Sequence, residues 1–292
     1  MISLTIFTPT FNRAYTLERL YKSLLRQTNK DFEWLIVDDG STDKTKEIIG
    51  KWIDEGEIPI RYIYQKNRGK HIAHNLGVDN ARGKLFTCLD SDDWFYDDAV
   101  EYIIEFYSSI SNEKEIAGII GIDTYENREI IGEPFPSNIN FSNWKDLNFK
   151  HNLKGDKAIF FVTNVIKEFP FPDNMDKHMP PSYQLYKIGS QFTFALTNKE
   201  IKFVEYLPDG ITFNIRKKYK VAPYNYCEYR KLMMRISPTL VFKLKNAVHY
   251  NISKRYLKEN VLINDMKYID RSIIALTSPI GLVAWLLIEF KK

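Results

Sequence analysis

The stretch Lys84-Leu85-Phe86-Thr87-Cys88-Leu89, followed at once by Asp90-Ser91-Asp92-Asp93, decides the fold class. A short apolar run that ends in an acidic turn is typical of a buried strand whose carboxyl end meets solvent. Three earlier segments have the same character, and polar residues follow two of them directly. These predicted strands are Leu4–Thr8, Phe32–Val37 and Ile60–Tyr64.

Helical segments separate these strands. Apolar residues recur at helical spacing over Leu17–Leu25, around Ile48–Ile53 and in the segment that ends near Ala81. Strands that alternate with helices predict an α/β fold, with a Rossmann-like, mostly parallel central sheet flanked by helices. Residues 134–183 show weak periodicity and predict loops with short elements. From about Val221 the pattern becomes helical and basic, which predicts a C-terminal helical extension.

Composition indicates an ordinary folded protein. The chain has 292 residues, of which 44% are hydrophobic and 27% charged. Its two cysteines, Cys88 and Cys227, offer neither a disulfide framework nor a CxxC metal pair. We therefore expect reduced thiols in a cytoplasmic protein, and the N-terminal residues look like a strand rather than a secretory signal.

The charge is divided unevenly along the chain. Residues 216–292 hold 16 Lys and Arg against 5 Asp and Glu, a net charge of +11. The remaining residues hold 25 basic and 32 acidic side chains, a net charge of −7. This division predicts that the C-terminal region meets an anionic partner, either nucleic acid or the inner surface of the membrane.

Three polar clusters follow predicted strands: Thr8–Arg13, Asp38–Ser41 and Asp90–Asp93. Parallel neighbouring strands bring such clusters to one edge of the sheet, where ligands of open α/β sheets bind. Three carboxylates within Asp90–Asp93 repel one another unless a cation lies among them. Because hard oxygen ligands suit Mg²⁺ or Mn²⁺, the cluster predicts a divalent metal that bridges carboxylates to phosphate oxygens.

These motifs resemble those of the inverting family 2 glycosyltransferases with the GT-A fold. The resemblance covers roughly residues 1–110, in the same order and at the same spacing. Its motifs are Thr8-Pro9-Thr10-Phe11-Asn12-Arg13, Val37-Asp38-Asp39-Gly40-Ser41-Thr42-Asp43, Asn67-Arg68-Gly69-Lys70-His71 with His74-Asn75 and Gly77, and Leu89-Asp90-Ser91-Asp92-Asp93.

The resemblance implies a nucleotide-sugar site. Asp39 accepts a hydrogen bond from the base, with uracil N3–H as the expected donor. Asp92 is expected to ligate the metal directly, and Asp90, the second metal-site residue, is expected to face the ribose or the metal's water shell. Arg68 and Lys70 lie near the base or diphosphate, where cations offset phosphate charge. The full set of implied nucleotide-binding residues is Thr8, Pro9, Thr10, Asn12, Arg13, Asp39, Arg68, Lys70, Asp90 and Ser91.

A general base is expected after the middle of the domain. Members of the resembling group place an acidic-Lys-aromatic pattern there, followed by Pro-Glu-Ser-Tyr. Asp176-Lys177 matches the first acid, and Asp176 is the predicted catalytic base, with Asp173 as the alternative. Pro181 stands where the second acid of that pattern would be, which is a departure from the pattern.

The resemblance implies metal-dependent transfer of a hexose from a nucleotide diphosphate donor, expected to be a UDP-sugar, to a glycan or lipid-linked acceptor. We expect a role in assembling a capsule or another cell-surface polysaccharide. Residues 1–215 are the predicted catalytic domain, with a donor half (1–110) and an acceptor half (111–215). The alternatives are a nucleotide-sugar-binding protein with little transfer activity and a basic nucleic-acid-binding protein.

The C-terminal region, residues 216–292, predicts peripheral attachment to the inner face of the cell membrane. Its apolar stretch Ile273–Ile288 has 16 residues, fewer than the ~20 that span a bilayer. A basic amphipathic surface with an apolar end suits a monotopic helix on anionic lipid. The alternative is that these helices only pack on the catalytic domain.

Overall fold

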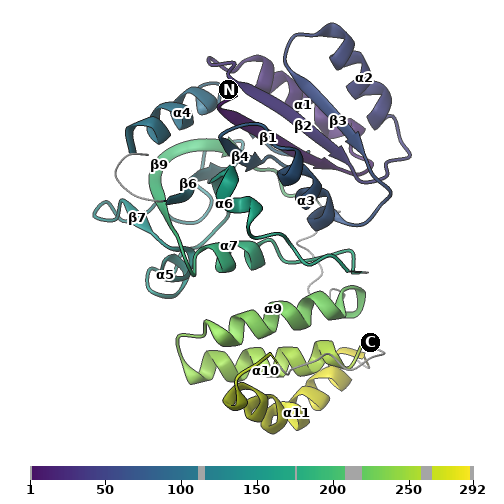
Figure 1. Cartoon of the computed structure of the whole chain (residues 1–292), viewed down its shortest axis with the longest axis vertical. Helices are drawn as coiled ribbons and strands as arrows, with labels where there is room; N and C mark the ends of the chain where they lie inside the picture. The colour runs from purple at the N-terminus through teal and green to yellow at the C-terminus, as the bar shows by residue number, and fades with distance from the viewer. Residues whose placement is uncertain (1, 111–115, 175, 208–218, 258–264, 290–292) are drawn as a thin grey trace. The chain divides into compact units, whose positions relative to one another are not determined.

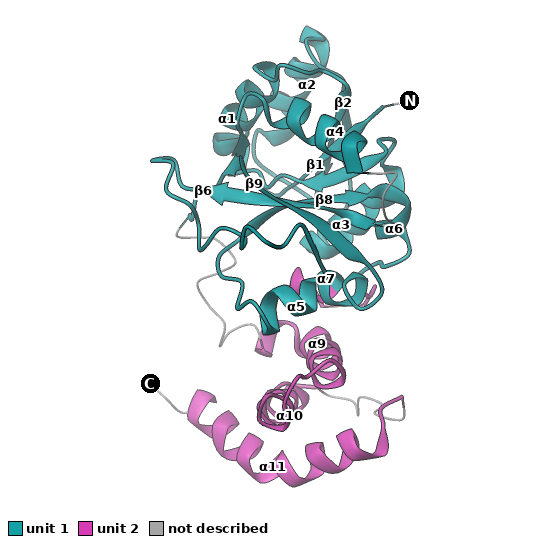
Figure 2. Ribbon diagram, turned by 90° about the vertical axis from the view of Figure 1, so that its left-hand side faces the viewer, with its two compact units in different colours: residues 1–171, 184–207 teal, residues 172–183, 208–292 magenta. Residues whose placement is uncertain are grey.

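The computed structural model describes residues 2–110, 116–174, 176–207, 219–257 and 265–289. The chain folds into two compact units, shown in different colours in Figure 2. The first comprises residues 1–171 and 184–207, and the second comprises residues 172–183 and 208–292. The segment 172–183, which contains Asp176, therefore belongs with the C-terminal helices.

The described strands form one mixed sheet in the first unit (Figure 1). They are β1 Leu4–Thr10, β2 Phe32–Asp38, β3 Ile60–Tyr64, β4 Leu85–Cys88, β5 Trp94–Phe95, β6 Ile116–Thr124, β7 Phe141–Ser142, β8 Lys157–Val162 and β9 Thr193–Phe203. Their order is β3-β2-β1-β4-β8-β6-β9-β5, and β7 pairs with β9. The pairs β1–β2, β2–β3 and β1–β4 are parallel, whereas β8 is antiparallel to both β4 and β6.

This topology brings several strand ends to one edge. Since β8 is antiparallel to both its neighbours, β6 runs in the same direction as β4, and β9 is parallel to β6. The carboxyl ends of β1, β2, β4, β6 and β9 therefore share one edge of the sheet. The predicted Rossmann-like α/β fold is confirmed, and its parallel pairs lie in β3-β2-β1-β4 and between β6 and β9.

Helices cover both faces of the sheet (Figures 1 and 2). The helices of this part are α1 Ala14–Leu25, α2 Thr45–Glu55, α3 Lys70–Asn80, α4 Ala99–Ile110, α5 Trp144–Phe149, α6 Thr163–Lys167 and α7 Ser182–Ile188. The core on one face joins β1 and β2 to α1, α2 and α4, with Tyr21 stacked on Trp52 at 4.4 Å. On the other face α3 approaches β1 at Gly77, where a Cβ would lie 2.4 Å from the Phe7 ring.

The second unit contains α9 Pro223–Arg235, α10 Leu240–Lys254 and α11 Tyr268–Glu289. Its small core includes Cys227, Met234, Tyr250 and Ile274. The helical character predicted beyond Val221 is present in these helices. Thr239 caps α10 by accepting a hydrogen bond from Phe242 N at 3.2 Å.

The apolar C-terminal stretch lies in α11, a helix of 22 residues that contains an 18-residue window with a mean hydropathy of 1.8. Among the described helices, this one alone is long and apolar enough to cross a membrane by length and composition. The helix extends beyond the apolar stretch of 16 residues, because it begins at Tyr268 and Pro279 does not end it.

Candidate active site

The three predicted polar clusters meet at the shared edge of the sheet. Thr10 at the end of β1 lies opposite Asp38 at the end of β2. Cys88 is the last residue of β4, which pairs with the other side of β1. The segment Asp90–Asp93 therefore leaves the sheet beside the loop that follows β1. We call this edge the rim; it consists of residues 10–13, 38–43, 65–70 and 90–93.

Asp39 organises the loop that follows β3. Its Oδ1 accepts hydrogen bonds from Gln65 Nε2 at 2.6 Å and from Arg68 N at 2.8 Å. Its Oδ2 accepts one from Gly69 N at 2.8 Å. A carboxylate has about four acceptor positions, so three protein donors leave one for a ligand. The hydrogen bond to Arg68 N also fixes the start of the segment that leads to Lys70.

Gly40 allows the two loops to approach this closely. Its φ of +89° lies in the left-handed region, and a Cβ there would lie 2.9 Å from Asn67 N. Any other residue would strain the backbone and push the loops apart. The Asp-Gly pair at the end of β2 is therefore required by the geometry of the rim.

Asn12 joins the end of β1 to the end of β2. Its N–H donates to Ser41 Oγ at 2.8 Å, and its Oδ1 accepts from Thr42 N at 2.8 Å. Its φ of +54° is one that asparagine tolerates better than most residues. Arg13 follows as the N-cap residue of α1, and its guanidinium donates to the Tyr15 hydroxyl.

The three residues Thr8, Pro9 and Thr10 do not share one role. Thr8 has 0% exposure and its hydroxyl accepts a hydrogen bond from Trp34 Nε1 at 2.9 Å, so its side chain supports the core. That Thr8 lines the nucleoside slot stays a prediction. Thr10 differs, because its buried Oγ1 has no hydrogen-bond partner among the described residues.

Lys70 and Asp90 form the closest ion pair of the rim, with 2.6 Å between Nζ and Oδ2. Burial alone would lower the pKa of Lys70, but the adjacent Asp90 carboxylate outweighs it and raises that pKa above its ordinary value. Burial likewise opposes ionisation of Asp90, yet Lys70 keeps its pKa below the ordinary value. Both side chains therefore stay charged at neutral pH, and the positive charge of Lys70 lies at the start of α3.

Asp92 has the opposite electrostatic character. Burial, followed by the negative charge of Asp90, raises the pKa of the Asp92 carboxyl. The positive charges of Lys70 and Arg13 oppose this rise only in part. Among the described residues, no group of three His, Cys, Asp or Glu side chains is arranged to hold a metal. Asp90 and Asp92 offer hard oxygen ligands of the type that would hold a divalent cation.

The residues Lys202 and Asp123 were missed by the sequence interpretation. Lys202 of β9 lies between two buried carboxylates, with its Nζ 3.2 Å from Asp93 and 3.4 Å from Asp123. Asp93 N donates to Asp90 O at 3.0 Å, so this buried cluster supports the acidic turn. Asp123 near the end of the apolar strand β6 carried the same signal as Asp90, an acid at a strand end. The local sequence pattern did not indicate that the Lys202 side chain points toward these two carboxylates.

Replacing Lys202 with methionine is expected to destabilise the fold. It leaves Asp93 and Asp123 buried without their cation, and removing one partner of a buried ion pair costs about 3–5 kcal/mol. Lys199→Met on the same strand is the matched control, because its ion pair with Asp98 is partly exposed and is worth about 0–1 kcal/mol. Urea unfolding of both variants measures the difference. Equal midpoints would show that the buried cluster contributes nothing special.

Asp176 lies in the second unit, where it contacts the first turn of α9. Its Oδ2 accepts a hydrogen bond from Asn225 N at 2.8 Å, and its own N–H donates to Asn174 Oδ1 at 2.8 Å. Burial raises the pKa of Asp176, although the backbone donors of α9 oppose that rise. The predicted base thus also acts as a helix cap.

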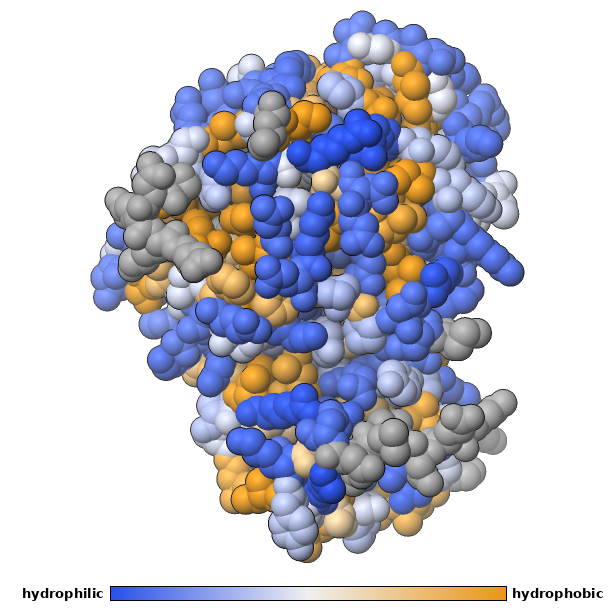
Figure 3. All heavy atoms as spheres, in the orientation of Figure 1, coloured by the Kyte–Doolittle hydropathy of each residue, from blue (hydrophilic) through white to orange (hydrophobic). Residues whose placement is uncertain are grey.

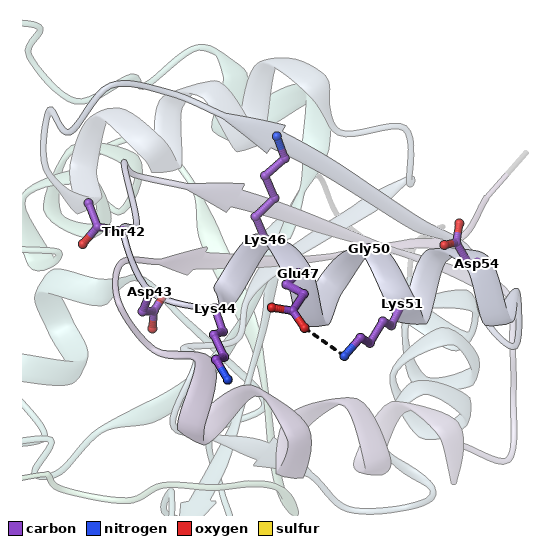
Figure 4. A pocket seen from close by; sticks show the side chains of 8 residues that line it. All are labelled: Thr42, Asp43, Lys44, Lys46, Glu47, Gly50, Lys51 and Asp54. Atoms are coloured by element: carbon purple, nitrogen blue, oxygen red, sulfur yellow. Dashed lines mark hydrogen bonds and ion pairs between the residues drawn. The ribbon is translucent and has the colours of Figure 1, made fainter.

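Two shallow depressions lie in the first unit. One follows the outer face of α2, is lined by residues such as Thr42, Lys44 and Lys51, and contains none of the carboxylates of Asp90–Asp93 (Figure 4). The other adjoins the acidic turn and is lined by Trp94, Tyr125, Glu126, Asn127, Val204, Glu205 and Tyr206. Arg19 ties the second depression to the turn, since it donates to Asp92 O at 2.9 Å and pairs with Glu205.

Some known proteins are similar to part of this chain in sequence, and others are similar to it in fold. An uncharacterized glycosyltransferase of Rickettsia conorii is 43% identical over 103 residues, which are 35% of this chain and 17% of that protein. The match therefore spans about a sixth of the relative's length. Staphylococcus aureus TarS, solved with UDP-GlcNAc, has a TM-score of 0.61 at 16% identity, covering 98% of this chain and 81% of that one.

A mannosyltransferase of Pyrobaculum calidifontis, solved with GDP-Man and Mn²⁺, has a TM-score of 0.57 at 15% identity, covering 99% of this chain and 87% of that one. These two solved structures share the fold of this chain. The sequence model described as glycosyl transferase family 2 matches residues 5–167, more than half of the chain and all four motifs of the rim. The chain therefore belongs to glycosyl transferase family 2.

Proposed function

We propose that the chain transfers a hexose, with inversion, from a nucleotide diphosphate donor to a hydroxyl of a glycan or lipid-linked acceptor. The observation that carries this proposal is the rim: Asp39 follows β2, Asp90 and Asp92 follow β4 on the other side of β1, and Lys70 at the start of α3 pairs with Asp90. Such an edge combines an acceptor for a base N–H, a cation for phosphate and carboxylates for a metal.

The donor is proposed to be a UDP-sugar. The fourth acceptor position of Asp39 takes the uracil N3–H, and the unpartnered Thr10 hydroxyl lines the nucleoside slot beside Pro9. Lys70 and Arg68 offset diphosphate charge, while Asn12, Arg13 and Ser91 complete the walls. A UDP-sugar in TarS and a GDP-sugar in the archaeal mannosyltransferase support a nucleotide-sugar donor in general.

Asp92, assisted by Asp90, is proposed to hold Mn²⁺ or Mg²⁺. The bound ion would neutralise the departing diphosphate as a Lewis acid. The chain's own part is to keep two carboxylates ionised side by side, which Lys70 does for Asp90. The raised pKa of Asp92 indicates a carboxylate whose charge a cation would stabilise.

Asp176 is proposed as the general base. It would take the proton of the acceptor hydroxyl, whose oxygen then attacks the anomeric carbon on the side opposite the diphosphate. One displacement of this kind inverts the configuration and needs no enzyme nucleophile. Burial favours this role because a raised pKa makes the carboxylate a better proton acceptor.

Two observations favour a second candidate, a nucleotide-sugar-binding protein with little transfer activity. Pro181 replaces the acid expected there, and Asp176 is engaged by the backbone of α9. The two candidates share the donor site and differ only in whether the protein has a working general base.

The acceptor and the location remain part of the proposal. We propose a role in building cell-surface polysaccharide on the inner face of the cell membrane. The net charge of +11 on residues 216–292 favours attraction to anionic lipid.

Calorimetric titration with UDP and with GDP, each with and without Mn²⁺, tests the donor site. We expect UDP to bind in the presence of Mn²⁺ and to bind much more weakly after EDTA. Tight binding of GDP but not UDP would show that the donor carries guanine in place of uracil. Binding of neither nucleotide would contradict the proposed donor site.

A further inference from the structure

The helix α11 has one face buried in the second unit and one face exposed. Its buried residues are Asp270, Ile273, Ile274, Thr277 and Gly281. The exposed large apolar residues, which we call the apolar face, are Ile269, Leu276, Ile280, Leu282, Val283, Leu286 and Leu287. Leu276 is 76% exposed and Val283 is 57% exposed. Hydrophobic residues accordingly reach the surface of the second unit beside hydrophilic ones (Figure 3).

The buried face is held by specific contacts with α10. Asn251 Nδ2 donates to Ile274 O at 2.9 Å and to Thr277 Oγ1 at 3.1 Å. At Gly281 a Cβ would lie 2.5 Å from Asn251 Cβ, so the two helices are in close contact. Figure 2 shows α11 as a curved helix that runs across α10 within this unit. A helix fixed sideways to a polar partner cannot be surrounded by lipid, although its length and hydropathy would allow it to span.

An ion pair at the start of the helix strengthens this restraint. Asp270 has 1% of its side chain exposed and pairs with Lys243 of α10 at 2.7 Å. To span a bilayer, α11 would have to separate from α10 and leave both charges without their partners. Crossing the membrane therefore conflicts with the packing of the second unit.

The charge pattern identifies what covers the apolar face. No charged residue occurs from Ser272 to Ile288, yet residues 216–292 carry a net charge of +11. Lys245, Arg255 and Lys267 are exposed on this unit. A contiguous exposed apolar surface in a basic region suits a membrane whose acyl chains take the apolar side chains and whose anionic headgroups take the lysines and arginines.

We propose that α11 lies flat in the interface of an anionic bilayer, with the apolar face inserted and the opposite face still packed on α10. This inference rests on the proposed membrane location and specifies its contact surface and its mode. It needs neither donor nor acceptor, so a vesicle assay tests it independently of transfer activity.

Flotation of the full chain with vesicles tests the inference. We expect the protein to float with phosphatidylcholine vesicles that contain 25% phosphatidylglycerol, and much less with phosphatidylcholine alone. High salt should weaken the binding without abolishing it, and alkaline carbonate should extract the protein. Retention after carbonate would mean that the helix spans the bilayer, and a protein that never floats would remove the lipid partner; either result overturns the proposal.

A double variant identifies the face. Leu276→Glu with Val283→Glu should reduce vesicle binding at least tenfold and leave the thermal unfolding temperature almost unchanged, since both side chains are exposed. The matched control is Ile53→Glu, an exposed apolar residue of α2 in the first unit. Flotation of the double variant equal to that of the control would overturn the assignment of this face. A second result would overturn it too: a stable dimer in solution that does not bind vesicles and that the double variant dissociates.

Discussion

Asp92→Asn is expected to remove Mn²⁺-dependent nucleotide binding and to lower donor turnover by about 10²–10³-fold. The amide is neutral and a poorer ligand for a hard cation than the carboxylate. The fold should survive, because Asp92 lies at the rim and the substitution also relieves its repulsion with Asp90. Calorimetry with UDP and Mn²⁺, together with turnover of the donor, measures both effects.

Asp97→Asn is the matched control for this variant. Asp97 lies five residues further along and forms an exposed ion pair with Arg26, so its loss should change neither binding nor turnover. Unchanged affinity of the Asp92 variant for UDP in the presence of Mn²⁺ would contradict the proposed metal ligand.

Asp176→Asn is expected to lower kcat by about 10²–10⁴-fold while leaving the affinity for UDP unchanged. Asparagine caps helices about as well as aspartate, so the contact with Asn225 N at the start of α9 can persist. The amide cannot take a proton, and the variant therefore separates the chemical role from the cap. Single-turnover kinetics and nucleotide calorimetry provide the two readings.

Two further variants delimit the role of Asp176. Asp176→Ala removes both functions and should in addition destabilise the protein by about 0.5–2 kcal/mol. Asp173→Asn, three residues earlier, should keep its turnover. Turnover of Asp176→Asn within twofold of the unaltered protein would move the base elsewhere, and a loss confined to the Asp173 variant would assign it there.

The donor half of the fold could be predicted because its signals are local. β3 was predicted at its observed bounds, and the predicted ends of β1, β2 and β4 lie within two residues of the observed ones. β8 could not be predicted, since it lies in a segment without clear periodicity. β8 pairs antiparallel with β4 and β6, and nothing in the sequence near β8 indicates this pairing.

The candidate site could be predicted only as a set of strand ends. The rule that parallel strands end at one edge placed Asp39 and Asp90–Asp93 on a common rim. The hydrogen bonds that decide each role come from distant residues: Trp34 turns Thr8 to the core, and Asn225 engages Asp176. Such partners depend on tertiary packing, which neither spacing nor composition encodes.

The most direct test of the central claim is release of nucleoside diphosphate from a panel of nucleotide sugars. The protein is incubated with UDP-, GDP- and other nucleotide hexoses in the presence of Mn²⁺, with EDTA as the paired condition. We predict that one UDP-sugar is slowly hydrolysed without an acceptor, and that EDTA stops the reaction. Absence of diphosphate release from every donor, by a protein that binds UDP, would contradict the account of an active glycosyltransferase and favour a nucleotide-sugar-binding protein.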